Sequence, residues 1–503
     1  MSFGMSIQMR YQSLRWSAHL PSDAVSYAID QELYDQALVW ADQGRSIIWG
    51  QVLQLRLPLA ELHRVEPRLA ERLVQLTSDL DGAQTTKFEV ASGSDILPDN
   101  FLQHLNNATE WTGLIEEVRR VPGFNRFLRP KTSAEILSAI NALGGPVIYL
   151  NANRYSSDAL AIVPGLDEVL HIPLHDLDFQ LLKAVQILFR RSLSGTRGRE
   201  EITLDRIGKL VKDPGDAIAP HLQLSFPNVL RFLWERVVKP VLDGLAISSS
   251  ADLPRIWWCP SGPLSSLPLH AAGRYEQFGD NILDYVISSY ASTASIALHA
   301  TRPESHQGFR LLAVANPKGC GLPGTERELE IIRNHATEYE MAEIVGEDAT
   351  VEAVRREMEK ASWVHFACHG VQDTGDPTES ALILANRTRL TLLEITKLSL
   401  PKAQFAFLSA CQTAKGTDKT PDEFAHLASG MLVAGYRSVI GTMWQISDEY
   451  APFVADRVYK RLLETPQPDY RRSAYALNEA VRALRKEPGV GFRHWVPFIH
   501  FGV

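Results

Sequence analysis

Two hydrophobic patterns alternate along the chain after residue 305. Short continuous apolar runs are typical of strands buried on both faces, and apolar residues three and four positions apart are typical of amphipathic helices. Strands are predicted for RLLAVANP, MAEIV, WVHFACHG, QFAFLSAC and RSVIGTMW, and helices for TERELEIIRNHA, VEAVRREMEKA, LTLLEITKL, DEFAHLASGMLVAG and YAPFVADRVYKRLLE. This alternation predicts an α/β fold with a mostly parallel sheet and helices on both faces.

Two of these predicted helices carry signals for their ends. Thr325 and Glu328 have the spacing of a capping box, in which each side chain bonds to the backbone of the first helical turn. Gly435 follows the apolar run of another helix, and glycine is common just past a helix C-terminus. We therefore expect the first helix to be capped by its own residues and the second to end at Gly435.

The first 305 residues show two other patterns. Residues 1–80 have small and apolar residues at helical spacing, which predicts a helical segment. Its alanines allow close approach of two helices, which fits a tetratricopeptide-like hairpin or a plain helical cap equally well: Ala24, Ala28, Ala37 and Ala41. Residues 81–305 mix strands and helices, and GGPVIYLNANRYSSDALAIV predicts a strand, a polar turn and a strand. We therefore divide the chain into 1–80, 81–305 and 306–503.

Composition narrows the class of protein. The formal charge of the 503 residues is −8 (51 basic against 59 acidic), which disfavours a nucleic-acid-binding surface. Four cysteines are too few for a secreted disulfide framework: Cys259, Cys320, Cys368 and Cys411. The N-terminus lacks the apolar core of a signal peptide, and no apolar stretch is long enough to span a membrane. We expect a cytoplasmic protein with free thiols that does not bind membranes, nucleic acid or a cofactor.

Two predicted strands end in reactive side chains. His369 follows WVHFAC and Cys411 ends QFAFLSAC, and active sites of open α/β sheets lie at the carboxyl ends of strands. If the two strands are neighbours, the imidazole can deprotonate the thiol and make it nucleophilic. The backbone N–H groups of Gly370 and Cys411 are then the expected donors to an oxyanion.

Simpler interpretations of these residues also exist. A single cysteine in a strand is more often part of the core than catalytic. Strand alternation turns Cys368 to the face opposite His369, so we expect it in the core, and His365 lies mid-strand, where burial is expected. A zinc site formed by Cys368, His369 and Cys411 would lack the usual ligand spacing.

A second functional class rests on residues 319–324. GCGLPG matches the G-x-G-x-x-G pattern between a strand and a helix, and Glu347 lies 23 residues past Gly324, as in a dinucleotide-binding unit. Three residues separate the strand from the first glycine, and Pro323 stiffens the turn that should hold a pyrophosphate. Dinucleotide binding therefore stays an alternative, as does a catalytically silent interaction module.

The motifs HFACHG, LSACQTAKG with its cysteine 42 positions after the histidine, and SVIGTMWQISD resemble the CHAT family of caspase-like cysteine peptidases. RIWWCPSGPLSSLPLHAAG and HWVPFIHFGV fit the same family, so the resemblance covers roughly residues 230–503. It implies a caspase-like fold, a dyad of His369 and Cys411, and cleavage of a protein substrate. It also implies that the middle region is an inactive caspase-like half.

The resemblance further suggests where the substrate binds. The strand with Trp444 and Asp448 would form one wall of the pocket for the residue before the cleaved bond, and its Trp–Asp spacing resembles separases, where the acid receives an arginine. Asp373 or Asp376 could supply the acid instead, and Ser447 or Asp448 could simply cap the next helix. Two further residues, Ser409 and Asn316, complete the expected substrate site. We also expect regulation by a protein partner through the N-terminal helices.

Overall fold

The computed structural model describes most of the chain. The described residues are 17–45, 61–82, 99–193, 225–276, 280–294, 308–318, 321–322, 324–373, 375–410 and 426–503, with Leu14, Ile47, Leu59 and Thr413. Cys411 and most of the segment that follows it lie outside this set.

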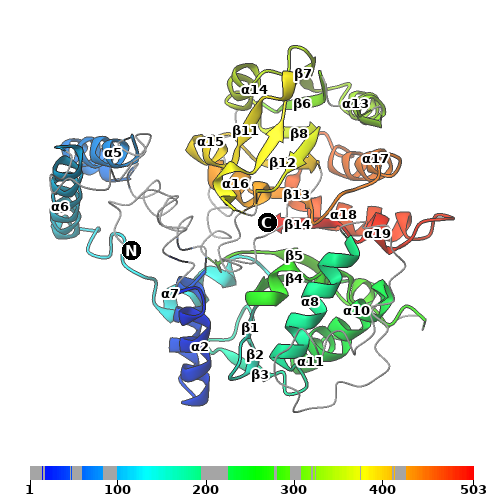
Figure 1. The fold of residues 1–503 in the computed structure, drawn as a ribbon, viewed down its shortest axis with the longest axis horizontal. Helices are drawn as coiled ribbons and strands as arrows, with labels where there is room; N and C mark the ends of the chain where they lie inside the picture. The colour runs from blue at the N-terminus through cyan, green and yellow to red at the C-terminus, as the bar shows by residue number, and fades with distance from the viewer. Residues whose placement is uncertain are drawn as a thin grey trace, which may run out of the picture.

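An eleven-stranded sheet crosses the molecule, in the order β3-β2-β1-β4-β5-β14-β13-β12-β8-β6-β7 (Figure 1). Its strands are β1 (Val147–Ala152), β2 (Ser157–Ile162), β3 (Leu170–Pro173), β4 (Arg255–Pro260), β5 (Ile287–Tyr290), β6 (Arg310–Pro317), β7 (Glu340–Gly346), β8 (Trp363–Ala367), β12 (Phe405–Ser409), β13 (Ser438–Thr442) and β14 (Phe498–Gly502). Neighbouring strands are parallel except in the pairs β1–β2, β2–β3 and β13–β14. The predicted mostly parallel sheet is therefore confirmed, and its central strands are buried throughout.

The C-terminal strand joins two sets of strands. β14 pairs in parallel with β5, which precedes residue 305, and antiparallel with β13, which follows it. Strands β1, β4 and β5 therefore run opposite to β13, β12, β8, β6 and β7. The carboxyl ends of the two sets consequently lie at opposite edges of one continuous sheet.

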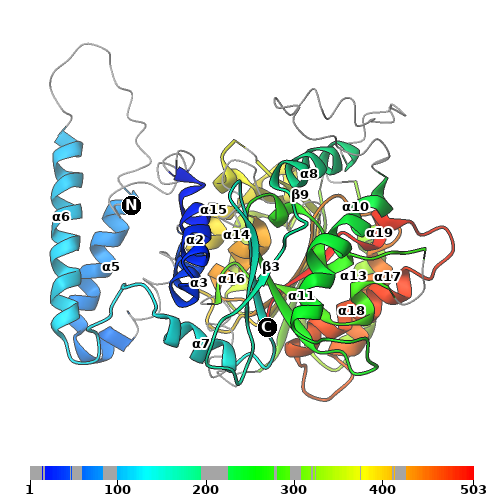
Figure 2. The same cartoon turned by 90° about the horizontal axis from the view of Figure 1, so that it is seen from below.

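Helices cover both faces of the second set of strands. They are α13 (Gly324–His335), α14 (Val351–Met358), α15 (Leu392–Lys397), α16 (Leu427–Ala434), α17 (Ala451–Leu462), α18 (Ser473–Leu484) and the short α19 (Phe492–Trp495). Both views show α14, α15 and α16 on one side of the sheet and α13, α17 and α18 on the other (Figures 1 and 2). Each predicted helix of this region is present, and α16 ends at Gly435 as expected. Residues 422–425 of that prediction lie outside the described residues.

The predicted capping box of α13 is wrong. Thr325 already lies inside the helix and its hydroxyl donates to the carbonyl oxygen of Leu322 at 2.6 Å. Glu328 does not return to the backbone, because its side chain points into the core, where it is 1% exposed. The helix is capped by a residue from a different part of the chain, which is described with the site below.

A second sheet of three short antiparallel strands follows β8. Its order is β11-β10-β9, formed by β9 (His369–Val371), β10 (Ala381–Ile383) and β11 (Arg389–Thr391). The chain thus leaves the large sheet at Ala367 and enters the small one at His369, with only Cys368 between them. A capping box formed by Thr391 and Glu394 opens α15.

The first set of strands carries its own helices. They are α7 (Ser133–Asn141), α8 (Phe179–Leu193), α10 (Phe226–Leu233) and α11 (Lys239–Gly244). A single π-helical turn, Trp234–Val238, joins α10 to α11 just before Pro240, whose missing N–H interrupts regular helical bonding. The predicted strand–turn–strand is the antiparallel pair β1–β2.

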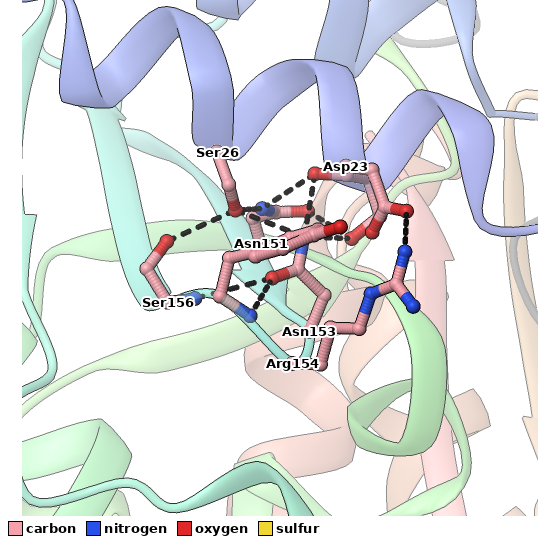
Figure 3. A network of polar contacts seen from close by, with 8 residues as sticks. Asp23, Ser26, Asn151, Asn153, Arg154 and Ser156 are labelled. Carbon is pink, nitrogen blue, oxygen red and sulfur yellow. Dashed lines mark hydrogen bonds and ion pairs between the residues drawn. The ribbon is translucent and has the colours of Figure 1, made fainter.

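The N-terminal helices α2 (Leu20–Asp30) and α3 (Tyr34–Gln43) pack against β1. Their contact is partly polar (Figure 3): the Ser26 hydroxyl accepts from the side-chain amides of Asn151 and Asn153 at 3.0 and 2.9 Å, and lies 2.9 Å from Ser156 Oγ. Ser22 donates to Asn151 Oδ1 at 2.6 Å. These bonds satisfy buried amide groups at the carboxyl end of β1, so they fix the helical pair to the sheet.

A second helical pair lies apart from the sheet. Helices α5 (Pro67–Gly82) and α6 (Asp99–Arg120) extend beside the main body (Figure 2). They share a small apolar core of their own: Leu62, Ala70, Leu73, Leu76, Trp111, Ile115, Val118 and Phe127. The tetratricopeptide-like interpretation of residues 1–80 stays a prediction.

One large apolar core draws side chains from all three predicted regions of the chain. The boundaries at residues 80 and 305, and the inactive caspase-like character of 81–305, stay predictions. In the described part of the chain, no helix has the length and apolarity that crossing a membrane requires.

Candidate active site

The two strands that carry the predicted dyad are neighbours. β8 and β12 pair in parallel, and their last registered pair is Ala367 opposite Ser409. His369 and Cys411 each follow a member of this pair by two residues. Cys411 lies outside the described residues, so its contact with the imidazole stays a prediction.

The path of the chain after β8 separates His369 from its neighbours in sequence. Cys368 is 2% exposed and belongs to the core, as predicted. His369 begins β9, pairs with Ile383 of β10 and is half-buried. The change of sheet at Cys368 therefore moves His369 out of the core.

His365 is buried, as predicted, but its surroundings were not foreseen. Its ring is 1% exposed, and its two nitrogens face polar groups from two helices. Nδ1 lies 3.2 Å from the Tyr459 hydroxyl of α17, and Nε2 lies 3.4 Å from Glu328 Oε1 of α13. Burial and the nearby Glu328 carboxylate raise the pKa of Tyr459 well above its ordinary value. Tyr459 therefore keeps its proton and can donate it to Nδ1.

The residues on either side of the predicted nucleophile are anchored to β13. Thr442 Oγ1 donates to the carbonyl oxygen of Ala410 at 2.7 Å, and Thr442 N donates to Thr413 Oγ1 at 2.9 Å. The Thr413 carbonyl also accepts from Ala428 N in the first turn of α16. Ala410, Thr413 and Thr442 are all buried, so these bonds fix Ala410 and Thr413 to the carboxyl end of β13.

Two predicted substrate residues sit at strand ends. Ser409 is 6% exposed, and its Oγ has no hydrogen-bond partner among the described residues. Asn316 adopts a left-handed conformation (φ 42°) at a bulge of β6, and its amide donates to Glu326 Oε1 at 3.1 Å. Both residues therefore mark the carboxyl edge of the second set of strands.

The acidic residues after His369 organise their own loop. Asp373 Oδ1 accepts from the backbone N–H groups of Gly375 and Asp376 at 2.8 and 2.9 Å. Asp376 Oδ1 accepts from the backbone and hydroxyl of Thr378 at 3.1 and 2.5 Å. Both carboxylates thus make the local bonds of turn-forming aspartates, which disfavours either of them as the acid of a substrate pocket.

Trp444 lies in an aromatic cluster that joins the two parts of the sheet. Its ring is 7% exposed and contacts Phe189 of α8 and Phe226 of α10 edge-on, with ring centroids 5.6 and 5.7 Å apart. Its indole N–H donates to the Arg493 carbonyl at 3.2 Å. The indole therefore packs mainly against protein, and its role as a pocket wall stays a prediction.

Asp448 caps a helix, but not the one that follows it. Its Oδ2 accepts from the backbone N–H of Gly324, the first residue of α13, at 2.8 Å. The following helix, α17, begins after Tyr450 without a side-chain cap, so the expected capping by Ser447 or Asp448 is wrong. Asp448 is half-buried, and its contact with substrate stays a prediction.

The same contact disfavours the dinucleotide alternative. A pyrophosphate would need the N–H groups at the start of α13, where the Asp448 carboxylate already binds and would repel an anion. Glu347, the proposed ribose ligand, pairs with Lys318. Residues 319, 320 and 323 of the motif lie outside the described residues.

Two residues that shape this region, Thr442 and Tyr459, were not singled out in the sequence, and two others, Gly324 and Glu328, were assigned different roles. One of them left a signal, because Glu328 lies on the apolar stripe of its helix with Leu329 and Ile332, which predicts a buried carboxylate. The contacts of the other three join residues far apart in the chain, and no local sequence pattern predicts such contacts. Within the described ranges, no three His, Cys, Asp or Glu side chains are grouped to hold a metal ion.

Comparison with known proteins places the chain in a family. The model of the CHAT domain matches residues 227–503, more than half of the chain. Among solved structures, the Arg-specific cysteine proteinase gingipain R is 13% identical over 55% of this chain and 67% of that one, with a TM-score of 0.38. The Saccharomyces cerevisiae separase–securin complex is 11% identical over 88% of this chain and only 37% of that one, with a TM-score of 0.45.

These structural likenesses are too weak to support an argument about the site. No curated protein sequence matches the chain. The assignment rests on the match over residues 227–503, which contain both strands of the candidate site and every residue proposed for it. The chain belongs to the CHAT domain family.

Proposed function

We propose that this protein is a cysteine endopeptidase whose nucleophile is Cys411 and whose general base and acid is His369. The observation that carries the proposal is the parallel register of β8 and β12, in which Ala367 is opposite Ser409. Two residues that follow a registered pair by the same number of positions start from the same edge of the sheet. Family membership supports cysteine peptidase chemistry for this pair.

In the proposed reaction, His369 takes the thiol proton and the Cys411 sulfur attacks the carbonyl carbon of a substrate peptide bond. The N–H groups of Gly370 and Cys411 bind the oxyanion that forms. The C–N bond then breaks, and the imidazolium gives its proton to the leaving amine. Water hydrolyses the thioester, which releases the carboxylic acid and returns the proton to the thiol. No cofactor enters these steps.

The proposed substrate is a protein with a basic residue before the cleaved bond. Asp448 is the proposed acid of this pocket, with Trp444, Ser409, Asp373 and Asn316 as further lining residues. Asp448 can serve because, among the described residues, its carboxylate accepts only from Gly324 N through Oδ2, which leaves Oδ1 to accept from a guanidinium. A medium-sized apolar residue at this substrate position is the alternative preference.

Control by a protein partner is part of the proposal. The α5–α6 pair has its own core and extends beside the main body, which is the arrangement of a docking arm. A catalytically silent interaction module is the competing function, and the peptide-cleavage assay described next decides between the two functions.

Replacement of the dyad tests the proposal. Cys411→Ala and His369→Ala should each lower cleavage of a peptide library at least about 1,000-fold, because the dyad residues act as a unit. Cys368→Ala, which changes the adjacent buried thiol, should keep activity within about threefold of the wild type. A wild-type protein that cleaves nothing, with or without partners, would favour the silent module, and activity that survives in Cys411→Ala would overturn the nucleophile assignment.

A further inference from the structure

One carboxylate ties together the starts of two helices. Asp448 lies three residues before α17 begins at Ala451, and its Oδ2 accepts from Gly324 N at the start of α13. The helix N-terminus carries a partial positive charge, which attracts the carboxylate. Asp448 thus links the start of α13 to the segment before α17, and its Oδ1 also lies close to Gly324.

Gly324 fits this contact because it has no side chain. A Cβ atom at this position would lie 2.4 Å from the Asp448 carbonyl oxygen and 2.7 Å from its Cγ and Oδ1. Real Cβ atoms do not approach that closely, and these Asp448 atoms belong to the backbone and a short carboxylate rather than to the end of a flexible side chain. Any larger residue at 324 would therefore displace Asp448.

The same two helices share a buried polar cluster. It consists of Glu328, one turn after Gly324 on α13, His365 in the middle of β8, and Tyr459, two turns into α17. The three residues are at most 1% exposed, with His365 Nδ1 3.2 Å from the Tyr459 hydroxyl and Nε2 3.4 Å from Glu328 Oε1.

This cluster limits how the helices can sit on β8. His365 Nε2 and Glu328 Oε1 make no hydrogen bond among the described residues, so their 3.4 Å contact is the polar interaction that a shift of either helix along the strand would remove. Outside the core, His335 of α13 and Asp456 of α17 add a second link at 2.8 Å. The register of both helices is thereby set against the strand that ends two residues before His369.

We propose that Gly324, Glu328, His365 and Tyr459 are positioning residues that hold Asp448 in place to select the basic residue before the cleaved bond. The inference rests on the proposed peptidase function. None of the four residues touches the reacting atoms. They act by fixing α13, and through it Asp448, to β8, the strand that also leads to His369.

The test compares two peptides that differ only in having arginine or leucine before the cleaved bond. The measured quantity is the ratio of their kcat/KM values, which does not depend on the fraction of folded enzyme. Gly324→Ala should lower this ratio at least tenfold, mainly through a higher KM for the arginine peptide. Glu328→Gln and Tyr459→Phe, which keep side-chain volume, should lower it about threefold to tenfold.

Matched controls change the same residue types at exposed sites. Glu330→Gln on α13 and Tyr475→Phe on α18 should keep the wild-type ratio. Alkylation of Cys411 by iodoacetamide should proceed at the wild-type rate in all variants, because the small reagent does not use the pocket. If Gly324→Ala does not fold, Tyr459→Phe, which loses a single hydroxyl, still decides the outcome.

Three results would overturn the inference. If Asp448→Ala loses the arginine preference while the folded Gly324, Glu328 and Tyr459 variants keep it, Asp448 selects substrate without these residues. If the wild type prefers leucine and Asp448→Ala changes nothing, the peptidase remains but the pocket is elsewhere. If the wild type cleaves neither peptide and Cys411 resists alkylation, the proposed function itself has failed.

Discussion

The carboxyl ends of the two sets of strands lie at opposite edges of the sheet, and the polar groups at these two edges are bonded differently. At the ends of β1 and β4, Arg45 donates to the carbonyl oxygens of Leu150 and Cys259, and the Asn151 amide is bonded to α2 (Figure 3). At the ends of β8 and β12, His369 turns into a small separate sheet and Ser409 keeps a buried hydroxyl without a partner in the described ranges.

The difference shows that a polar residue at a strand end is not by itself evidence of a site. The first edge has polar and charged residues too, including a buried arginine, yet its hydrogen bonds go to the helices that cover it. Polar groups that are satisfied by internal hydrogen bonds stabilise the fold. The second edge is the better candidate for chemistry because His369 is only half-buried there and Ser409 Oγ has no hydrogen-bond partner among the described residues.

Unfolding at acidic pH tests whether the two edges of the sheet belong to one cooperative unit. Burial lowers the pKa of His270 to about 4 and that of His426 to about 3, and burial with the nearby Arg255 lowers the pKa of His500 well below its ordinary value. The unfolded chain therefore binds more protons as pH falls below about 6.5, and the folded protein loses stability. Three such groups together should lower the free energy of unfolding by about 4 kcal/mol per pH unit between roughly pH 6 and pH 4.5.

Urea unfolding at several pH values measures this slope. A single transition is expected, since His270 lies before residue 305, His426 and His500 lie after it, and one sheet and one apolar core span both parts. His426→Asn keeps an acceptor for the N–H of Ser429 at the start of α16 and should reduce the slope by about a third. Two separate transitions would show that the edges unfold independently.

Arg45→Met tests the first edge alone. It would leave the Leu150 and Cys259 carbonyl groups without this donor, so the free energy of unfolding should fall by about 3 kcal/mol. Arg154→Met is the control, because Arg154 is exposed and its ion pair with Asp23 is long, at 3.4 Å. This variant should change the free energy of unfolding by about 0.5 kcal/mol or less. Cleavage by folded Arg45→Met should match the wild type; a large loss would place the first edge in the catalytic machinery.

Ser409→Ala tests the second edge and has the smallest expected effect on stability. Its buried Oγ has no partner among the described residues, so its loss should change the free energy of unfolding by about 0.5 kcal/mol or less. Ser289→Ala is the matched control: its buried hydroxyl bonds to Arg255 and His500, and its loss should cost about 1–3 kcal/mol. Ser409→Ala should instead raise KM several-fold, and equal destabilisation by both variants would contradict the comparison.

Much of the fold after residue 305 follows from hydrophobic patterning. Each strand and helix predicted there is present, because continuous apolar runs and helical spacing reflect burial within the element itself. Patterning could not show that β14, the last strand, closes the gap between β5 and β13. Pairing between strands so distant in the chain depends on the assembled sheet.

The site was predicted to the extent that local sequence determines it. The placement of the two reactive side chains just after predicted strands follows from the alternating pattern, which left open whether β8 and β12 are neighbours. Burial was predicted for Cys368 from strand parity and for His365 from its mid-strand position. The partners of Asp448 and Glu328 do not, because each lies across the fold: Gly324 is 124 residues from Asp448. The Thr325–Glu328 spacing gave a false capping signal because tertiary packing drew Glu328 into the core.

Mass spectrometry of the protein treated with a peptidyl chloromethyl ketone tests the central claim most directly. The reagent should label Cys411 stoichiometrically in the wild type, at least about 100-fold more slowly in His369→Ala, and at an unchanged rate in Cys368→Ala. Labelling of Cys368 or Cys259 in place of Cys411, or a rate on Cys411 that does not depend on His369, would contradict the account.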